Sequence, residues 1–189
     1  MLKSALALGQ DLKEEGTDIG PRTIIRLERA LSHWRDTGEQ IVVAAGMSPR
    51  HPDQPCLMAD MMHDWLVEQG CTRVAVLRNA TLFNTEGELK AFFSPTNDVI
   101  VGCRSSIISA PWHLVRVRDQ VKAFFGREIV KDLKWIDVPL NVMSRKDRIL
   151  EPIKRLFFLS TKHLPDETRH RLWHSGIQTL NRVGINSSY

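Results

Sequence analysis

The sequence IISAPWHLVR, residues 107–116, changes character half-way along its length. The apolar, β-branched residues at its start are typical of a buried strand, and Pro111 is typical of the first turn of a helix. We therefore expect a strand that passes directly into a helix, with His113 and Arg116 at the start of that helix. Open α/β sheets bind ligands at such strand ends, so this stretch predicts both a fold class and the position of a site.

Apolar runs of strand length alternate with amphipathic segments along the rest of the chain. The predicted strands are 5–9, 41–46, 74–77, 106–109 and 135–138, and the predicted helices between them are 21–37, 57–69, 84–93 and 112–125. Such alternation is typical of parallel strands with helices on both faces. We predict a Rossmann-like three-layer α/β fold with a mainly parallel five-stranded sheet in the order 3-2-1-4-5, while residues 98–110 form either one long strand or two pieces.

The length of 189 residues suits one domain with a helical addition. We expect residues 1–140 to form the Rossmann-like domain and residues 141–189 to form a C-terminal helical extension packed on it, with helices at 147–159 and 165–183. No repeat and no low-complexity segment interrupts this plan.

Composition and charge disfavour several classes of protein. The 26 Lys and Arg residues against 22 Asp and Glu residues give a net charge of +4, and they are scattered, whereas nucleic-acid binding usually shows a concentrated basic stripe. Three cysteines without a CxxC pair favour a reduced compartment. No apolar stretch is long enough to span a bilayer, and a first strand close to Met1 leaves no room for a signal peptide. We expect a cytoplasmic protein.

The residue types at the predicted helix start suit an anion. Backbone N–H groups at a helix N-terminus favour negative charge, and an arginine can grip a phosphate or carboxylate with two hydrogen bonds. His113 is the candidate catalytic acid or base, or a phosphate ligand, and Arg116 and Ser109 are candidate ligand-binding residues. The alternative is a histidine hydrogen-bonded to a loop beside an arginine in a surface ion pair.

Other candidate ligand-binding residues follow the first three predicted strands. Arg22 and Arg26 are one helical turn apart and can close the site over an anion, although a solvated helix face is the alternative. Thr81 and Asn84 can bind a ribose or phosphate oxygen, or can cap a turn or helix. The remaining candidates are the strand-ending Gly9 and Gly46, which either admit a ligand to the backbone or simply form turns.

Several familiar sites are disfavoured. Neither GxGxxG nor the P-loop pattern is present, which argues against classical NAD and ATP sites. Ser48 and Ser109 lack the GxSxG context of a hydrolase nucleophile. His170 and His174 are four residues apart near His163, but without HExxH or a cysteine partner we interpret them as a surface pair and predict no metal site. If there is a cofactor, S-adenosylmethionine or a nucleotide is the candidate.

Four pieces of the chain, between residues 4 and 138, carry a family resemblance. They are the opening strand that ends in Gly9, the helix RTIIRLERA (22–30), the loop NATLFNT (79–85) and the segment SAPWHLVR (109–116). Together these resemble the YdcF-like family, a domain of unknown function that includes YdcF, SanA and ElyC. The loop is similar to the family's Arg-Asn-Thr-x-Glu-Asn pattern and the last segment to its Ser-x-x-His-x-x-Arg signature. The resemblance implies a Rossmann-like fold and a role near the cell envelope or with a nucleotide-type ligand.

The chain also departs from the family pattern. Gly46-Met47 replaces a Gly-Gly turn, Gln54-Pro55-Cys56 stands near an expected acidic residue, and Phe83 occupies another position where an acidic residue is common. The departures imply binding without the family's chemistry, unless Asp11, Asp18 or Asp53 supplies the carboxylate from elsewhere.

Three hypotheses about function follow. In the first, the protein binds, or binds and acts on, a phosphate-bearing small molecule such as a nucleotide, a nucleotide-sugar or a lipid-linked phosphate. In the second, it is a non-catalytic sensor of S-adenosylmethionine or a nucleotide that signals to a protein partner through its C-terminal helices. In the third, it is a protein-interaction module with a vestigial site.

Overall fold

A parallel sheet forms the middle layer of the fold. The computed structural model describes residues 3–9, 11–13, 15–47, 53–78, 84–94, 105–139, 145–165, 167–169, 171–172 and 175–176. Within these residues the strands are β1 (Ser4–Ala7), β2 (Gln40–Val43), β3 (Val74–Val76), β4 (Ser106–Ser109) and β5 (Lys134–Asp137). Their order is β3-β2-β1-β4-β5, and each neighbouring pair is parallel. The predicted fold class and strand order are confirmed.

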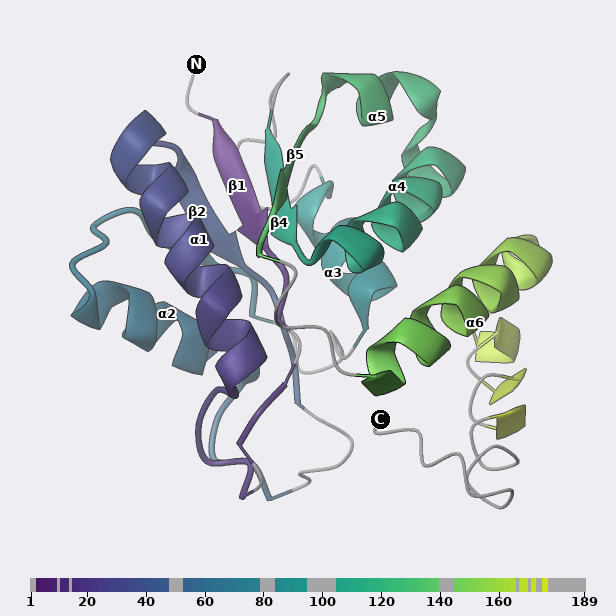
Figure 1. The fold of residues 1–189 in the computed structure, drawn as a ribbon, viewed down its shortest axis with the longest axis horizontal. Coiled ribbons are helices and arrows are strands. Elements are labelled where there is room, and N and C mark those ends of the chain that lie inside the picture. The colour runs from purple at the N-terminus through teal and green to yellow at the C-terminus, as the bar shows by residue number, and fades with distance from the viewer. Residues whose placement is uncertain are drawn as a thin grey trace.

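Helices cover both faces of the sheet (Figure 1). The helices α1 (Pro21–Thr37) and α2 (Met58–Glu68) lie on one side, and α3 (Thr85–Phe92) and α4 (Pro111–Phe125) lie on the other. Two further helices, α5 (Arg127–Asp132) and α6 (Arg145–Thr161), pack against α4. In the part of the chain described, we find no helix with the length and apolar character needed to cross a membrane.

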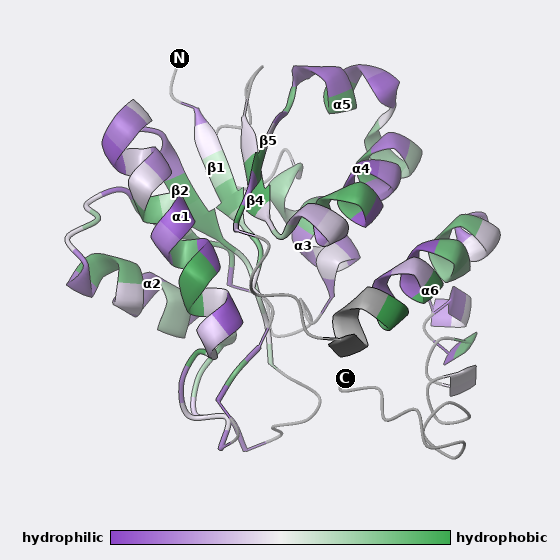
Figure 2. Cartoon of the chain, in the orientation of Figure 1, coloured by the Kyte–Doolittle hydropathy of each residue, from purple (hydrophilic) through white to green (hydrophobic). Residues whose placement is uncertain are grey.

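The core is split by the sheet into two apolar clusters. Ala5 and Ala7 of β1 face the cluster built with α1 and α2, whereas Leu6 and Leu8 face the cluster built with α3 and α4. This division follows from the two-residue period of a strand, whose successive side chains point to opposite faces. Figure 2 shows the result, with hydrophobic strands in the middle and hydrophilic residues on the outer faces of the helices.

The strand order places the predicted site at a topological switch point. β1 pairs with β2 on one side and with β4 on the other. The chain leaves β1 for α1 on one face and leaves β4 for α4 on the opposite face. The carboxyl ends of β1 and β4 therefore lie side by side where the two connections diverge, which is where open α/β sheets bind ligands.

The structure differs from the prediction in local detail. α5 was not predicted, because six residues are too few to show a helical period; Gly126, at a φ of +94°, ends α4 and turns the chain into it. Within the predicted loop 10–20, Leu12 and Ile19 form an antiparallel bridge. The sequence left open whether residues 98–110 form one long strand or two pieces. The first part of this stretch, 98–104, lies outside the described residues. So does much of the predicted helix 165–183, whose described residues 167–169, 171–172 and 175–176 are helical.

Candidate functional site

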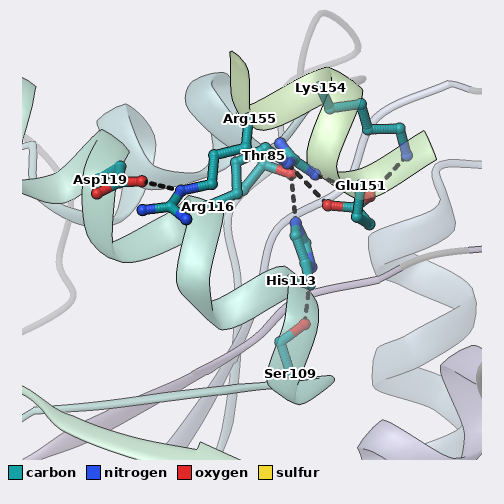
Figure 3. Close-up of polar contacts among 8 residues, drawn as sticks. All are labelled: Thr85, Ser109, His113, Arg116, Asp119, Glu151, Lys154 and Arg155. Atoms are coloured by element: carbon teal, nitrogen blue, oxygen red, sulfur yellow. Dashed lines mark hydrogen bonds and ion pairs between the residues drawn. The ribbon is translucent and has the colours of Figure 1, made fainter. Parts of the chain in front are cut away.

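His113 lies in the first turn of α4, directly beyond β4, as predicted (Figure 3). Its Nδ1 is 2.8 Å from the hydroxyl oxygen of Ser109, the last residue of β4. Its Nε2 is 3.1 Å from the hydroxyl oxygen of Thr85, the first residue of α3. The imidazole therefore joins the end of β4 to the start of α3 through two hydroxyl groups.

The environment of His113 keeps the imidazole neutral at physiological pH. The residue is 6% exposed, and burial, reinforced by the positive charge of Arg116, lowers its pKa well below the ordinary value of 6.5. A neutral imidazole donates a hydrogen bond from one nitrogen and accepts through the other. Ser109 and Thr85 suit this state because each hydroxyl can either donate or accept.

Arg116 reaches from α4 to a carboxylate on α6 (Figure 3). Its Nε and Nη2 atoms lie 3.0 and 3.5 Å from the two oxygens of Glu151, and Lys154 Nζ lies 2.7 Å from the same carboxylate. The side chains of Arg116, Glu151 and Lys154 are 13%, 8% and 13% exposed. The pairing of Arg116 agrees with the ion-pair alternative raised from the sequence, but the pair is buried and not on the surface.

Glu151 is held ionised by these neighbours. Burial alone would raise the pKa of this carboxyl, but the charge of Arg116, its hydrogen bond and the nearby Lys154 outweigh burial and hold the pKa far below 4.5. Glu151 therefore serves as a permanent negative charge between two cations at neutral pH.

Arg26 approaches the same region from α1. Its Nη1 donates to the carbonyl oxygens of Leu8 and Gly9, at 2.9 Å each, and the residue is 2% exposed. Burial lowers its pKa to about 10, against the opposing influence of Glu88 and then Asp11, so that the guanidinium is still charged at neutral pH. Arg26 thus places a cation at the carboxyl end of β1.

Glu88 is a residue of the site that the sequence did not reveal. It lies on α3, one turn beyond Thr85, and is 6% exposed. Burial raises its pKa to about 8, although the charges of Arg26 and Arg116 oppose this shift. On the sequence, a glutamate in the first turns of a helix is an ordinary helix-stabilising residue, so no local signal singled it out. We call the following residues the strand-end cluster: Arg26, Glu88, His113, Arg116, Glu151 and Lys154.

Both candidate glycines lie against the start of α2. A Cβ added to Gly9 would lie 2.9 Å from Met58 Cε and 3.2 Å from Met62 Sδ, so glycine allows α2 to pack against the end of β1. The carbonyl of Gly46 accepts the amide of Met58 at 3.3 Å and leads the chain into α2. Close approach of a helix explains Gly9 without a ligand.

Of the two candidates after β3, the structure describes Asn84, which caps a helix. The Asn84 side-chain oxygen accepts the backbone N–H of Gly87 at 2.8 Å, which is the N-cap geometry of α3. This is the capping alternative considered from the sequence, and it orients Thr85 and Glu88 toward the strand-end cluster. Thr81 lies outside the described residues.

The side chain of Asp11 caps the first turn of α1, the turn that contains Arg22. Its carboxylate accepts the backbone N–H and the hydroxyl of Thr23, both at 3.0 Å, and a Cβ on Gly20 would collide with that carboxyl group. Arg22 is half-buried one turn before Arg26.

Of the three aspartates considered as replacements for the family carboxylate, Asp11 alone is electrostatically coupled to a cluster residue in the described structure. Asp18 pairs with Lys13, and Asp53 is exposed. The carboxyl groups of the cluster come instead from α3 and α6.

The structure gives no support to the other sites considered. Ser109 is fully buried against His113, and Ser48, His170 and His174 lie outside the described residues. Among the residues that are described, no three His, Cys, Asp or Glu side chains are grouped to hold a metal ion.

A separate polar network lies at the opposite, amino-terminal edge of the sheet. The Glu39 carboxylate lies 2.8 Å from His33 Nε2 and accepts the Ser106 hydroxyl at 2.9 Å. All three residues are at least nine-tenths buried, and Ser106 is fully buried. Because serine and histidine share one carboxylate oxygen inside the core, this network joins α1, β2 and β4 rather than presenting a nucleophile.

The chain was compared with protein-family models, with curated proteins and with solved structures. None of the three comparisons finds a match. The site is therefore interpreted from its own geometry.

Proposed function

We propose that this chain binds a small molecule carrying a phosphate, or a chemically similar oxyanion, at the carboxyl ends of β1 and β4. The gathering of cations in the strand-end cluster carries this proposal. Arg26, Arg116 and Lys154 lie together there, and each is mostly buried. A region lined by three cations attracts an anion, and buried charge is favourable when it is paired.

The start of α4 supports the same proposal. Its N-cap residue is Ala110, which has no side chain able to cap the helix, and Pro111 follows it. Backbone N–H groups at an uncapped helix start, together with the helix dipole, favour a negative group. Arg116 on the same helix adds a guanidinium, whose planar N–H groups match a phosphate or carboxylate.

The neutral state of His113 favours a role in binding over the acid–base role predicted from the sequence. An imidazole whose pKa lies well below 6.5 carries no proton to give at neutral pH and is a weak base. Through Ser109 and Thr85 it instead fixes the positions of the two hydroxyls beside the anion site. Ligand binding, with Thr85 as a hydrogen-bonding group, is the function that this geometry supports best.

The residues that α6 brings to the cluster favour a second candidate function, a ligand sensor that signals to a partner protein. Glu151 and Lys154 both come from α6, and Arg116 holds Glu151 where an anion would bind. A ligand that engages Arg116 competes with Glu151 and so changes the contact between α4 and α6. The bound state can then be read by a partner through the C-terminal helices.

A thermal-shift and calorimetric screen tests the proposal. The probes are inorganic phosphate, adenosine 5′-monophosphate, uridine diphosphate-glucose and S-adenosylmethionine. A ligand at 100 times its Kd should add about 2.7 kcal/mol to the free energy of unfolding.

The variant Lys154→Met removes one cluster cation while keeping the apolar stem. The matched control Arg155→Met removes the next charge on α6, which pairs with Asp119 and is more exposed than the cluster residues. We expect weaker binding in K154M and unchanged binding in R155M. Binding of none of the four probes to the wild type, or equal binding by both variants, would refute an anion site at this cluster.

The finer assignments stay predictions. They are membership of the YdcF-like family, the choice of a nucleotide as ligand, a role near the cell envelope and a cytoplasmic location. The screen tests one of them, the choice of a nucleotide, because a nucleotide site should bind adenosine 5′-monophosphate more tightly than inorganic phosphate.

A further inference from the structure

Glu88 is a buried carboxyl group without a hydrogen-bonding partner in the described structure. No hydrogen bond or ion pair joins its side chain to another described residue, although it is 6% exposed. Other buried glutamates in the described part of the chain are paired: Glu39 with His33, Glu86 with Lys90, and Glu151 with Arg116. Among the described residues, Gln120 Oε1 is the one fully enclosed side-chain N or O atom without a partner, so the Glu88 carboxyl oxygens are open to water or to a ligand. A mostly buried carboxyl group with no protein partner is therefore available to bind a ligand oxygen.

The position of Glu88 directs it toward the strand-end cluster. Residues three apart lie on one face of a helix, so Glu88 shares a face with Thr85, whose hydroxyl contacts His113. Its carboxyl is electrostatically coupled to Arg26 on α1 and to Arg116 on α4. These three relations place Glu88 beside the cations that form the proposed anion site.

We propose that Glu88 is a ligand-contacting residue that binds the oxyanion in its protonated form, donating its carboxyl O–H to a ligand oxygen. This inference rests on the proposed function of the site. It makes anion binding dependent on a proton: the neutral carboxyl group donates a hydrogen bond, whereas the carboxylate repels the anion. It also favours ligands whose oxygens are strong acceptors, such as phosphate and sulfate groups.

The charged surroundings of Glu88 are consistent with this state. Burial raises its pKa to about 8, so the carboxyl group is mostly protonated at pH 7. The charged groups coupled to Glu88 are Arg26 on α1 and Arg116 on α4. The other titratable and charged groups in or beside the cluster are Asp11 after β1, Glu86 and Lys90 on α3, Arg169, which pairs with Glu86, His113 on α4, and Glu151 and Lys154 on α6. Of the groups whose pKa is shifted, His113 and Glu151 titrate well below pH 7 and Arg26 near 10, which leaves Glu88 to titrate between pH 7 and 9.

Sulfate is the probe for the test, because it stays a dianion across this range and any pH dependence must come from the protein. Its affinity for wild-type protein is measured by calorimetry from pH 7 to pH 9. With a pKa of about 8, the neutral fraction of Glu88 falls to about a tenth at pH 9, so we expect a loss of affinity of up to about tenfold. Glu88→Gln should bind at pH 7 and show a flat profile, since its amide still donates but cannot ionise. Glu88→Leu should bind weakly at every pH.

Glu86→Gln is the matched control on the same helix. It removes a buried carboxylate that is paired with Lys90 and Arg169 and should keep the wild-type pH profile. Circular dichroism establishes that each variant is folded. A second measurement needs no ligand: the infrared carbonyl band of a protonated carboxyl group should be present at pH 7, disappear as pH rises through about 8, and be missing in E88Q.

Each outcome is decisive. A pH-dependent affinity that becomes flat in E88Q supports the proposal. Sulfate binding with the same pH profile in wild type and E88Q overturns the role of Glu88 and leaves the proposed function intact. If neither sulfate nor any of the four probes of the earlier screen binds at any pH, the proposed function is overturned and this inference with it. If sulfate fails but one of those probes binds, the pH series and the comparison with E88Q are run with that probe, and equal profiles overturn the role of Glu88. A Glu88 that the infrared band shows to be ionised at pH 7 overturns the inference whether or not sulfate binds.

Discussion

The buried ion pair between α4 and α6 gives a sharp prediction for stability. Glu151→Gln preserves the shape of the side chain but removes its charge. Arg116 and Lys154, each 13% exposed at the side chain, then lose their carboxylate. Removing one partner of a buried ion pair typically costs about 3–5 kcal/mol, because the remaining charge stays buried without compensation. We expect E151Q to lower the free energy of unfolding by about this amount.

The same pair of helices offers an internal control. Arg155 on α6 lies 2.6 Å from Asp119 on α4, but these side chains are 45% and 23% exposed. Ion pairs that water can reach are worth about 0–1 kcal/mol. Asp119→Asn should therefore cost less than about 1 kcal/mol, although it removes a charge from the same helix–helix contact.

Urea unfolding followed by circular dichroism measures both variants, with the slopes of the transitions compared to confirm a common unfolded state. The double variant Arg116→Met/Glu151→Leu completes the test, since replacing a buried pair by apolar residues is often close to neutral. A cost for E151Q no larger than that for D119N would refute the conclusion that Glu151 compensates buried positive charge.

Three further predictions concern individual residues. The wild-type free energy of unfolding should fall as pH rises from about 6.5 to about 8, by up to about 1.4 kcal/mol per pH unit, because folded Glu88 keeps a proton that the unfolded chain has released. Below about 6.5 the buried neutral His113 acts in the opposite direction, because the unfolded chain protonates this residue and the folded chain does not. Denaturant titrations at several pH values above 6.5 should find the slope reduced in E88Q. Asp11→Ala should lose about 1 kcal/mol by uncapping the backbone N–H of Thr23, and a cost near zero by urea unfolding would argue against a cap there. Ser106→Ala should lose about 1–2 kcal/mol, because the buried Glu39 carboxylate loses a donor; thermal unfolding that matches the wild type would contradict this.

The alternation of apolar and amphipathic segments was enough to predict the layers, and the positions of the candidate site residues suggested the strand order that the structure has. Periodicity is a local property, and right-handed crossovers restrict how successive strands can be arranged. The stretch around His113 was predictable for the same reason. A strand, a proline and a helix follow one another within ten residues, so His113 and Ser109 had to lie at a strand end.

Local roles were harder to predict where one residue type serves two purposes. The sequence left two roles possible for Asn84, ligand contact and capping, and the structure uses its side chain as a cap. The sequence left two roles possible for Gly9, ligand access and a turn, and in the structure Met58 packs against it. The sequence shows that a small or capping residue is present but not which atoms approach it.

The sequence by itself determined the fold class and the strand end where His113 lies, because both depend on residues close together in the chain. Tertiary structure alone decided which charges meet there. Glu88 comes from α3 and Glu151 from α6, and no spacing along the chain links either of them to Arg26 or Arg116. Burial then set their charge states, raising the pKa of Glu88, while Arg116 and Lys154 held Glu151 ionised. Desolvation and charge pairing depend on distances in space, which the order of residues does not contain.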